Sequence, residues 1–207
     1  MPDKSDQTIR DRIIHKCAEL FAVRGFSKIS MDEISRALGM SKKTIYKYFA
    51  GKDELVKTVI LNFRDTTLSR IQTVLSDDEL DFYMRLSKIL EVTGEQLSKI
   101  QKPILEDLKM YMPEFWAEIE EKRRTVLRQV YGTLISEGKE AGIIRHDVDI
   151  DFFLLMYMNL VTSIVNPEVL SRIPYSPSQV FNNIVKTLFT GILTEEARNK
   201  YYGKYLS

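Results

Sequence analysis

One short segment of this 207-residue chain concentrates side chains that could bind a negatively charged partner. The segment holds three lysines and two tyrosines, at Lys42, Lys43, Tyr46, Lys47 and Tyr48. Lysine side chains neutralise phosphates and release their counterions, and tyrosine hydroxyls donate hydrogen bonds to phosphate oxygens. These residue types therefore indicate a segment that binds a polyanion such as DNA. The alternative is an ordinary helix with a solvated lysine face.

Two short helices joined by a glycine turn are expected to position these side chains. Ser30 and Glu33 have the spacing of a capping box, which starts a helix at about Met31. Apolar residues then recur at helical spacing. Gly39 ends the helix, because glycine accepts the left-handed backbone found just past helix ends. The apolar stripe consists of Met31, Ile34, Ala37 and Leu38.

The second helix is expected to begin at Lys42, with Ser41 as its N-cap. Ile45 and Phe49 are four residues apart, so both face inward. This arrangement leaves the lysines, the tyrosines and Thr44 on the outer face. A helix of ordinary diameter fits the major groove of DNA with such a face toward the bases.

This block resembles the N-terminal domain of the TetR family of bacterial transcriptional regulators. The resemblance rests on Gly25-Phe26, the run from Met31 to Leu38, Gly39, and the pattern T-I-Y-K-Y-F followed by K-D-E-L. It covers roughly the first 55 residues and is specific as a block. It implies an all-α protein with a three-helix helix-turn-helix DNA-binding domain at residues 1–52. A larger helical domain for effector binding and dimerisation is then expected at residues 53–207.

The resemblance also implies which residues contact DNA. Lys42 and Lys43 lie at the start of the recognition helix and are candidates for base edges, whereas Lys47 could contact bases or phosphates. Many relatives have histidine at the position of Tyr48 and a small residue at that of Lys43, so their base preference does not transfer. Phosphate contacts are assigned to Thr44, Tyr46, Tyr48 and Lys52. With the capping serine, the predicted DNA-binding set is Ser30, Lys42, Lys43, Thr44, Tyr46, Lys47, Tyr48 and Lys52.

The distribution of charge agrees with a DNA-facing N-terminal part. Residues 1–55 hold 11 Lys and Arg against 8 Asp and Glu, whereas the remaining residues hold 19 against 21. The N-terminus lacks the apolar core of a signal peptide, and no run of about 18 apolar residues is present to span a membrane. We therefore expect a cytoplasmic protein with no membrane partner.

The sequence shows no signature of catalysis. It contains neither a phosphate-binding glycine loop nor a nucleophile elbow, and its two histidines, His15 and His146, lack the partners of a metal or catalytic site. One cysteine, Cys17, permits no internal disulfide, and its place on a helical face with Phe21 favours a buried apolar role over a reactive thiol. We therefore expect no enzyme, no metal and no cofactor.

Three carboxylates near the middle of the second half leave two readings open. Asp147, Asp149 and Asp151 alternate in a turn and could hold a cation. Helix capping is the commoner use of such residues.

The rest of the chain predicts about nine or ten helices in all and no strands. Thr8 with Asp11 marks the start of the first helix, and a fourth helix runs from about Asp53 to Leu75, a length of about 35 Å.

Capping residues, prolines and glycines mark the later boundaries. Ser76 with Glu79 is expected to start a helix through a second capping box, and Pro113 to occupy the first position of another. Gly138 and Gly142 are expected to end that helix.

Two helices near the C-terminus are expected to form a homodimer interface. Phe152–Val165 is apolar nearly all round but too short to span a membrane, and Val180–Leu193 carries a broad apolar stripe. A monomer that exposed both would carry a large apolar patch. We therefore expect both segments at a two-fold interface, where two helices from each chain close a four-helix bundle.

The second half is also rich in aromatic residues and methionines. Such a set forms either a packed core or an apolar ligand cavity. The resemblance favours the cavity, because TetR-like proteins carry a variable effector pocket in this domain. The predicted ligand-binding residues are Phe63, Tyr83, Tyr111, Phe115, Trp116, Tyr131 and Met156.

Three kinds of protein remain as hypotheses. The first is a transcriptional regulator, expected to be a repressor that a small and largely apolar ligand releases from a palindromic DNA operator. The second is a helical interaction protein that does not use DNA, and the third is a small-molecule enzyme with a DNA-binding head. Only the first explains both halves of the sequence, and a salt-dependent gel shift would distinguish it from the second.

Overall fold

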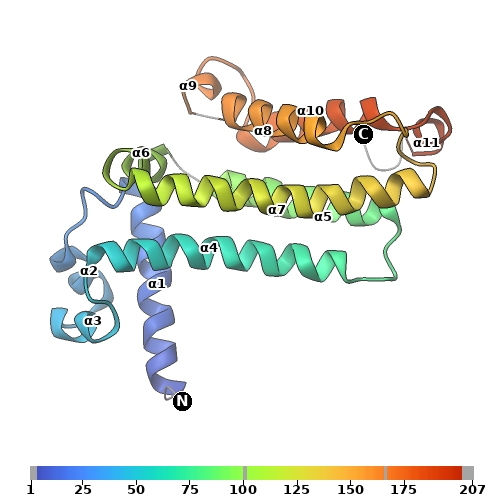
Figure 1. The fold of residues 1–207 in the computed structure, drawn as a ribbon. Coiled ribbons are helices and arrows are strands. Elements are labelled where there is room, and N and C mark those ends of the chain that lie inside the picture. The colour runs from blue at the N-terminus through green and yellow to red at the C-terminus, as the bar shows by residue number, and fades with distance from the viewer. Residues whose placement is uncertain (1–3, 100–101, 166, 202–207) are drawn as a thin grey trace. The chain divides into compact units, whose positions relative to one another are not determined.

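The computed structural model describes residues 4–99, 102–165 and 167–201, and the regular elements in these ranges are all helices (Figure 1). The predicted all-α class is confirmed. The helices are α1 Lys4–Arg24, α2 Met31–Leu38, α3 Lys42–Tyr48, α4 Lys52–Leu75, α5 Phe82–Lys99, α6 Lys102–Tyr111, α7 Pro113–Glu140, α8 Ile150–Ile164, α9 Pro167–Leu170, α10 Pro177–Ile192 and α11 Glu195–Tyr201. The prediction of nine or ten helices was therefore too low, because the short α9 and α11 lack a long apolar period.

The chain divides into two compact units. One consists of Met1–Leu68 with Lys99–Ala117, and the other of Ser69–Ser98 with Glu118–Ser207. Helices α4 and α7 each contribute residues to both units. The predicted functional division after residue 52 stays a prediction, since compact units report packing rather than function.

The first unit is built around α1, which packs against α2 and α6. Its inward face, with Ile13, Cys17 and Phe21, is fully buried. The predicted start at Thr8 was wrong, because α1 already includes Lys4. No glycine or proline interrupts residues 4–7, and contacts to α3 described below hold this additional turn.

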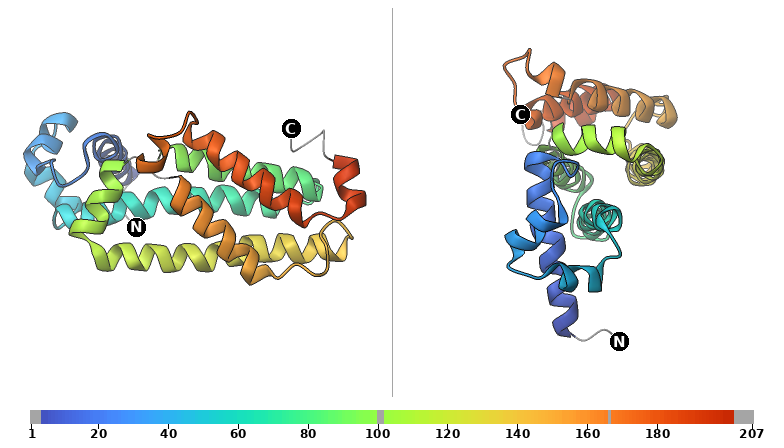
Figure 2. Two further views of the ribbon diagram at one scale, coloured as in Figure 1. Left: turned by 90° about the horizontal axis from the view of Figure 1, so that it is seen from above. Right: turned by 90° about the vertical axis from the view of Figure 1, so that its left-hand side faces the viewer.

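The second unit contains one large apolar core, to which α4, α5, α7, α8 and α10 contribute. Helices α8 and α10 lie side by side in it (Figure 1 and Figure 2). The aromatic side chains of Tyr131, Phe153, Phe181 and Phe189 are almost fully buried. Phe189 brings this cluster together, since its ring centroid lies 5.8 Å from that of Tyr131 and 5.0 Å from that of Phe153.

Two helix boundaries in the second unit differ from the prediction. Helix α5 begins at Phe82 rather than beside Ser76, because Asp81 is the effective cap and accepts a hydrogen bond from Met84 N at 2.8 Å. Helix α7 continues through Gly138, where a Cβ atom would lie 2.8 Å from the Ile144 side chain. That glycine therefore serves close packing rather than helix termination.

Other predicted boundaries are confirmed. Helix α7 begins at Pro113, and Gly142 follows its end in the left-handed conformation, with φ 68°. Asp149 caps α8 by accepting a hydrogen bond from Phe152 N at 2.9 Å. Asp151 and Asp147 instead pair with arginines, at 2.8 Å and 3.0 Å. Among the described residues, no cluster of potential metal ligands occurs, and none of the helices is long and apolar enough to cross a membrane.

Candidate nucleic-acid interface

Helix α2 and the turn after it have the predicted helix-turn-helix geometry. Ser30 Oγ accepts a hydrogen bond from Glu33 N at 3.2 Å, and Ser30 N donates to Glu33 Oε2 at 2.8 Å, so the capping box is complete. Gly39 has φ 63°, and its N–H donates to the carbonyl of Arg36 at 3.2 Å. Hydrogen bonds to the Glu33 carboxyl group from the Ser30 backbone N–H, then from the Ser30 hydroxyl group and Arg24, lower its pKa.

A side chain from α1 completes the end of α2. Arg12 Nη2 donates to the carbonyl oxygen of Leu38 at 3.0 Å. Helix ends leave such carbonyls without intrahelical partners, so the arginine both satisfies one of them and places a cation at the negative end of the helix dipole.

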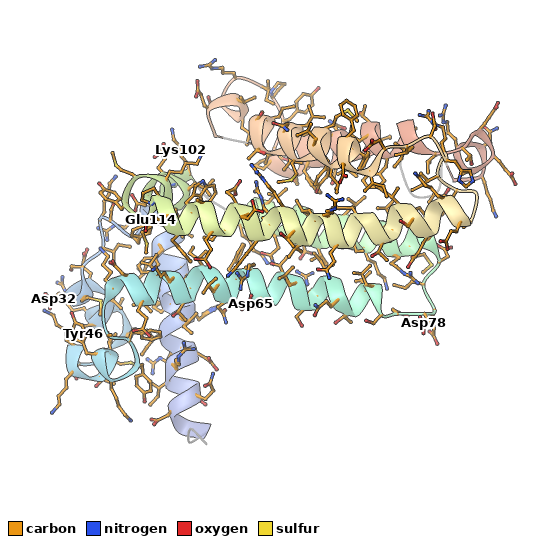
Figure 3. All side chains as sticks on the ribbon, viewed as in Figure 1. Asp32, Tyr46, Asp65, Asp78, Lys102 and Glu114 are labelled. Atoms are coloured by element: carbon orange, nitrogen blue, oxygen red, sulfur yellow. The ribbon has the colours of Figure 1, made fainter. Side chains whose placement is uncertain are left out.

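Helix α3 buries one side and exposes the other. Ser41 Oγ accepts from Thr44 N at 3.0 Å, while Ile45 and Phe49 are 0% and 1% exposed. Lys42, Lys43 and Lys47 are exposed, and Tyr46 is 48% exposed. Asp32 on α2 and Tyr46 on α3 are labelled in Figure 3. The helix therefore presents three cations and a tyrosine to solvent from a small apolar base.

Two of these lysines already have carboxylate partners. Lys42 Nζ lies 2.6 Å from Asp32 Oδ1, and Lys47 Nζ lies 3.1 Å from Asp6 Oδ1. Each ion pair is well exposed to solvent, so each contributes little to stability and a phosphate group can replace the carboxylate. Lys43, by contrast, has no carboxylate within ion-pair distance in the part of the chain that the structure describes.

Asp6 also binds the second tyrosine of α3. Tyr48 Oη donates to Asp6 Oδ1 at 2.6 Å, and the tyrosine is half-buried. The hydrogen bond from Tyr48 and then that from Lys47 lower the pKa of the Asp6 carboxyl group, and the same contacts raise the pKa values of both partners. Tyr48 is thus engaged within the chain, whereas the sequence pattern placed it on the free face.

The remaining predicted DNA-binding residues lie beside these groups. Ser30 is exposed at the start of α2, and the hydroxyl groups of Thr44 and Ser41 are 2.8 Å apart in the cap of α3. Lys52, the first residue of α4, has its Nζ atom 3.5 Å from the Ser27 carbonyl oxygen. The sequence did not predict Asp6 and Asp32 as partners of α3 side chains. For Asp6, no spacing rule links it to Tyr48 across 42 positions.

The predicted ligand-binding residues are divided between the two compact units. Phe63, Tyr111, Phe115 and Trp116 belong to the first unit, and Tyr83, Tyr131 and Met156 to the second.

In the first unit, Phe63 is half-buried, Tyr111 contacts the Phe26 ring, and the other two aromatic residues contact cations. Phe115 lies under Lys57 Nζ at 5.5 Å, and Trp116 under Lys109 Nζ at 5.6 Å. Tyr111 is 59% exposed.

In the second unit, two of the predicted residues are core residues. Tyr83 and Tyr131 are 3% and 1% exposed, and Met156 is half-buried. The Tyr131 and Tyr157 hydroxyl groups are 3.3 Å apart, and burial raises the pKa of each. A shallow hollow of about 350 Å³ in this unit is lined by Arg70, Thr73, Val74, Lys88, Glu91 and Val92, none of them a predicted ligand-binding residue.

Together, the helix pair and its cationic face define a helix-turn-helix transcriptional regulator. A family model described as "Bacterial regulatory proteins, tetR family" matches residues 13–59. Residues 13–59 therefore form the N-terminal helix-turn-helix domain of the TetR family of transcriptional regulators, and the rest of the chain is similar to regulators with that domain. This family is not one of enzymes.

Similarity extends beyond the helix-turn-helix. The chain is 28% identical to the HTH-type transcriptional regulator YvaF of Bacillus subtilis (strain 168), over 89% of this chain and 96% of that one. It is 24% identical to the HTH-type transcriptional repressor KstR2 of Mycolicibacterium smegmatis, over 72% of this chain and 75% of that one.

Solved structures share the fold. The ketosteroid transcriptional regulator KstR2 of Mycobacterium tuberculosis aligns with a TM-score of 0.59 at 20% identity, covering 90% of this chain and 95% of that one. The fatty acid degradation regulator FadR of Bacillus halodurans aligns with a TM-score of 0.65 at 21% identity, covering 88% and 95%.

Proposed function

We propose that this regulator is a cytoplasmic repressor that binds a palindromic or near-palindromic operator as a homodimer and is released by a small, largely apolar ligand. The observation that carries the DNA-binding part is the division of α3 into a buried apolar side and an exposed cationic side. Two relatives named as repressors support the direction of regulation.

The DNA contacts can be tested by sequence selection and by salt dependence. We assign Lys42 and Lys43 to base edges, Thr44, Tyr46, Tyr48 and Lys52 to phosphates, and Lys47 to either. Selection from random DNA should then yield sites with two-fold symmetry, and Lys42→Ala should change the selected sequence. Tyr46→Phe should weaken binding to every sequence alike, because a phosphate contact carries no sequence information. Binding that does not weaken as salt rises would favour an interaction protein that does not use DNA.

The outer face of α8 supports the homodimer. This helix buries Phe153, Tyr157 and Val161 within the chain, yet Phe152 and Leu155 on its other side are 59% and 58% exposed. Such an apolar face is costly to leave in water. We propose that Phe152–Val165 covers this face against a second copy.

Helix α10 would contribute to that interface in a different way from the one predicted. Its apolar stripe is used inside the chain, since Val180, Ile184 and Ile192 are all buried. Segment Val180–Leu193 would therefore meet the partner through its exposed polar side, which includes Asn183 and Thr187.

Light scattering tests the dimer directly. The double substitution of Phe152 and Leu155 by serine should convert a dimer into a monomer at micromolar concentration. Tyr175→Ser, which alters a residue that is 51% exposed outside α8 and α10, is the matched control and should leave the dimer intact. A wild-type protein that is already monomeric would contradict the proposal.

The regulatory part rests on α4. This helix runs without interruption from Lys52, beside the helix-turn-helix, to Leu75, a length of about 36 Å. A ligand that favours one arrangement of such an element can change DNA affinity, typically by about 1–3 kcal/mol or 5–150-fold. The ligand-binding candidates stay proposals within each unit: Phe63, Tyr111, Phe115 and Trp116 in the first, and Tyr83, Tyr131 and Met156 in the second.

Trp116 offers a direct assay, because it is the only tryptophan in the chain. The names of similar structures refer to ketosteroids and to fatty acid degradation, so steroids and long-chain fatty acids are suitable first probes. A probe that changes Trp116 fluorescence should release operator DNA over the same concentration range. Probes that bind tightly but leave operator affinity unchanged would contradict the coupling.

A further inference from the structure

A buried carboxylate on α6 binds the turn that leads into α2. Asp107 is 9% exposed, and both of its carboxylate oxygens accept hydrogen bonds from the same residue. Ser27 N donates to Oδ2 at 2.6 Å, and Ser27 Oγ donates to Oδ1 at 2.8 Å. Both residues belong to the first compact unit. Hydrogen bonds to an ionised, shielded acceptor are among the stronger ones in proteins, so this contact fixes the Ser27 backbone.

The turn is shaped to admit this carboxylate. Gly25 has φ 76°, and a Cβ atom on it would lie 2.4 Å from Asp107 Oδ2 and 3.2 Å from the Pro103 carbonyl oxygen. No other residue type fits there without displacing Asp107 or Pro103, quite apart from the strained backbone angle. The glycine that marks the family resemblance therefore has a second role, which is to let α6 approach the turn.

Ser27 also contacts Lys52, one of the proposed DNA-binding residues. Its carbonyl oxygen lies 3.5 Å from Lys52 Nζ. Lys52 is half-buried, and no carboxylate of the described residues lies within ion-pair distance of its ammonium group. A lysine ammonium has three donors, so a long contact to one carbonyl leaves two donors free for a phosphate. The Ser27 backbone thus holds Lys52 on one side and is itself held by Asp107 on the other.

We infer that Asp107 is a positioning residue for DNA binding, which acts through Ser27 to hold the Lys52 ammonium group where a DNA phosphate can meet it. This inference rests on the proposed phosphate contact of Lys52. Asp107 does not touch DNA in this scheme. It fixes the one backbone carbonyl that restrains a long and flexible side chain, and so reduces the conformational entropy that Lys52 loses on binding DNA.

The salt dependence of operator binding gives a readout that a purely structural role would not change. The slope of log K against log salt falls by about 0.9 for each phosphate contact that is lost. Lys52→Ala should therefore reduce the slope by about 0.9 for each half-site. Asp107→Ala should reduce the slope and weaken binding, although the removal of a negative charge would by itself strengthen binding to DNA. The double variant should match Lys52→Ala alone.

Two variants of α6 serve as controls. Asp107→Asn should restore the wild-type slope, because an amide can accept from Ser27 N with its oxygen and donate to Ser27 Oγ with its nitrogen. Glu106→Ala removes the same charge from the adjacent exposed position, whose carboxylate is 3.4 Å from Lys102 Nζ, and should leave the slope unchanged.

The outcomes separate this inference from the proposed function. If Lys52→Ala reduces the slope but a folded Asp107→Ala does not, Asp107 does not position Lys52. If Lys52→Ala leaves the slope unchanged, the proposed phosphate contact fails and the inference fails with it, while selection of a symmetric operator would still support the regulator.

A milder variant covers the case in which Asp107→Ala does not fold. Ser27→Ala removes the hydroxyl hydrogen bond and keeps the backbone one, so it should fold and weaken operator binding in the same direction by a smaller factor. Unchanged affinity and slope for Ser27→Ala would then overturn the inference.

Discussion

The outer face of α3 and the tyrosine pair between α7 and α8 use polar groups in opposite ways. On α3, Lys42 and Lys47 are exposed and paired with carboxylates that solvent also reaches. Between α7 and α8, the hydroxyl groups of Tyr131 and Tyr157 meet where the residues are 1% and 2% exposed. A polyanion can replace the carboxylates without disturbing the core, whereas a ligand could reach the tyrosine hydroxyls only by opening it.

This difference predicts how each region responds to substitution. The helix-turn-helix should tolerate changes on its outer face and be sensitive to the few apolar residues beneath it. The second compact unit should also be sensitive to substitution of the Tyr131–Tyr157 pair, because a buried polar group that loses its partner is destabilising. The following experiments test that contrast.

The largest effect is expected at Ile45. This residue is 0% exposed, and Ile45→Ala should lower the free energy of unfolding by about 2–5 kcal/mol, since it removes buried methyl groups and leaves a cavity. Urea denaturation measures this change. Tyr46→Ala, on the exposed side of the same helix, should change stability by less than about 0.5 kcal/mol while it weakens DNA binding. Equal stability losses for the two variants would contradict the division of α3 into two faces.

The pH dependence of the free energy of unfolding tests whether Cys17 is buried in the core of the first unit. Burial raises the pKa of its thiol from 9.0 to about 12. A group whose pKa is higher in the folded state contributes stability that is fully present below the unfolded-state pKa and is lost at higher pH. The free energy of unfolding should therefore fall by about 1.4 kcal/mol per pH unit above roughly pH 9, until the pH reaches the folded-state pKa.

A Cys17→Ala variant is the control for this experiment. It should lack that component of the pH dependence, although its overall stability will be lower. In the native wild-type protein at neutral pH, a thiol-reactive reagent should modify Cys17 only as fast as the protein unfolds. Rapid modification of the folded protein would contradict the buried position.

The tyrosine pair should give a smaller effect. Tyr157→Phe removes the hydroxyl–hydroxyl contact and should lower stability by about 0.5–1.5 kcal/mol. Tyr131→Phe should cost more, because the Tyr131 hydroxyl also interacts with Thr93. Thermal or urea unfolding of both variants tests this order, and Tyr175→Phe, at an exposed position, should have no measurable effect. If neither variant changes the stability, the tyrosine pair does not stabilise the second unit.

The same contrast explains what the sequence could predict. The capping box at Ser30, the left-handed Gly39 and the buried Ile45 all follow from residues within a few positions of one another, and the structure confirms each. The predicted start of α5 was wrong because Ser76 and Asp81 are both possible caps by local pattern, and the structure uses Asp81. The contacts of Asp6 with Tyr48 and of Asp107 with Ser27 join residues 42 and 80 positions apart, so no local pattern predicts them.

The smallest expected effect concerns Asp6, which tests whether the carboxylates beside α3 compete with DNA. Its pKa is lowered by the hydrogen bonds from Tyr48 and Lys47, so Asp6 is ionised at neutral pH. The stability from this contact is present above the unfolded-state pKa and is lost only as the pH falls through the lower folded-state value. Between pH 5 and 8 the contact should therefore be constant.

Asp6→Asn removes the charge but keeps an oxygen that can accept the hydrogen bond from Tyr48. Lys47 is then no longer held by a carboxylate, and operator affinity at low salt should rise roughly two- to fivefold, the range expected for one exposed ion pair. The increase should fade as salt screens the charges. The matched control is Asp11→Asn, which makes the same charge change on α1 at an exposed residue that accepts a hydrogen bond from Gln7 at 2.9 Å. If both variants raise affinity equally, the effect is one of net charge, and Asp6 does not compete with DNA for Lys47.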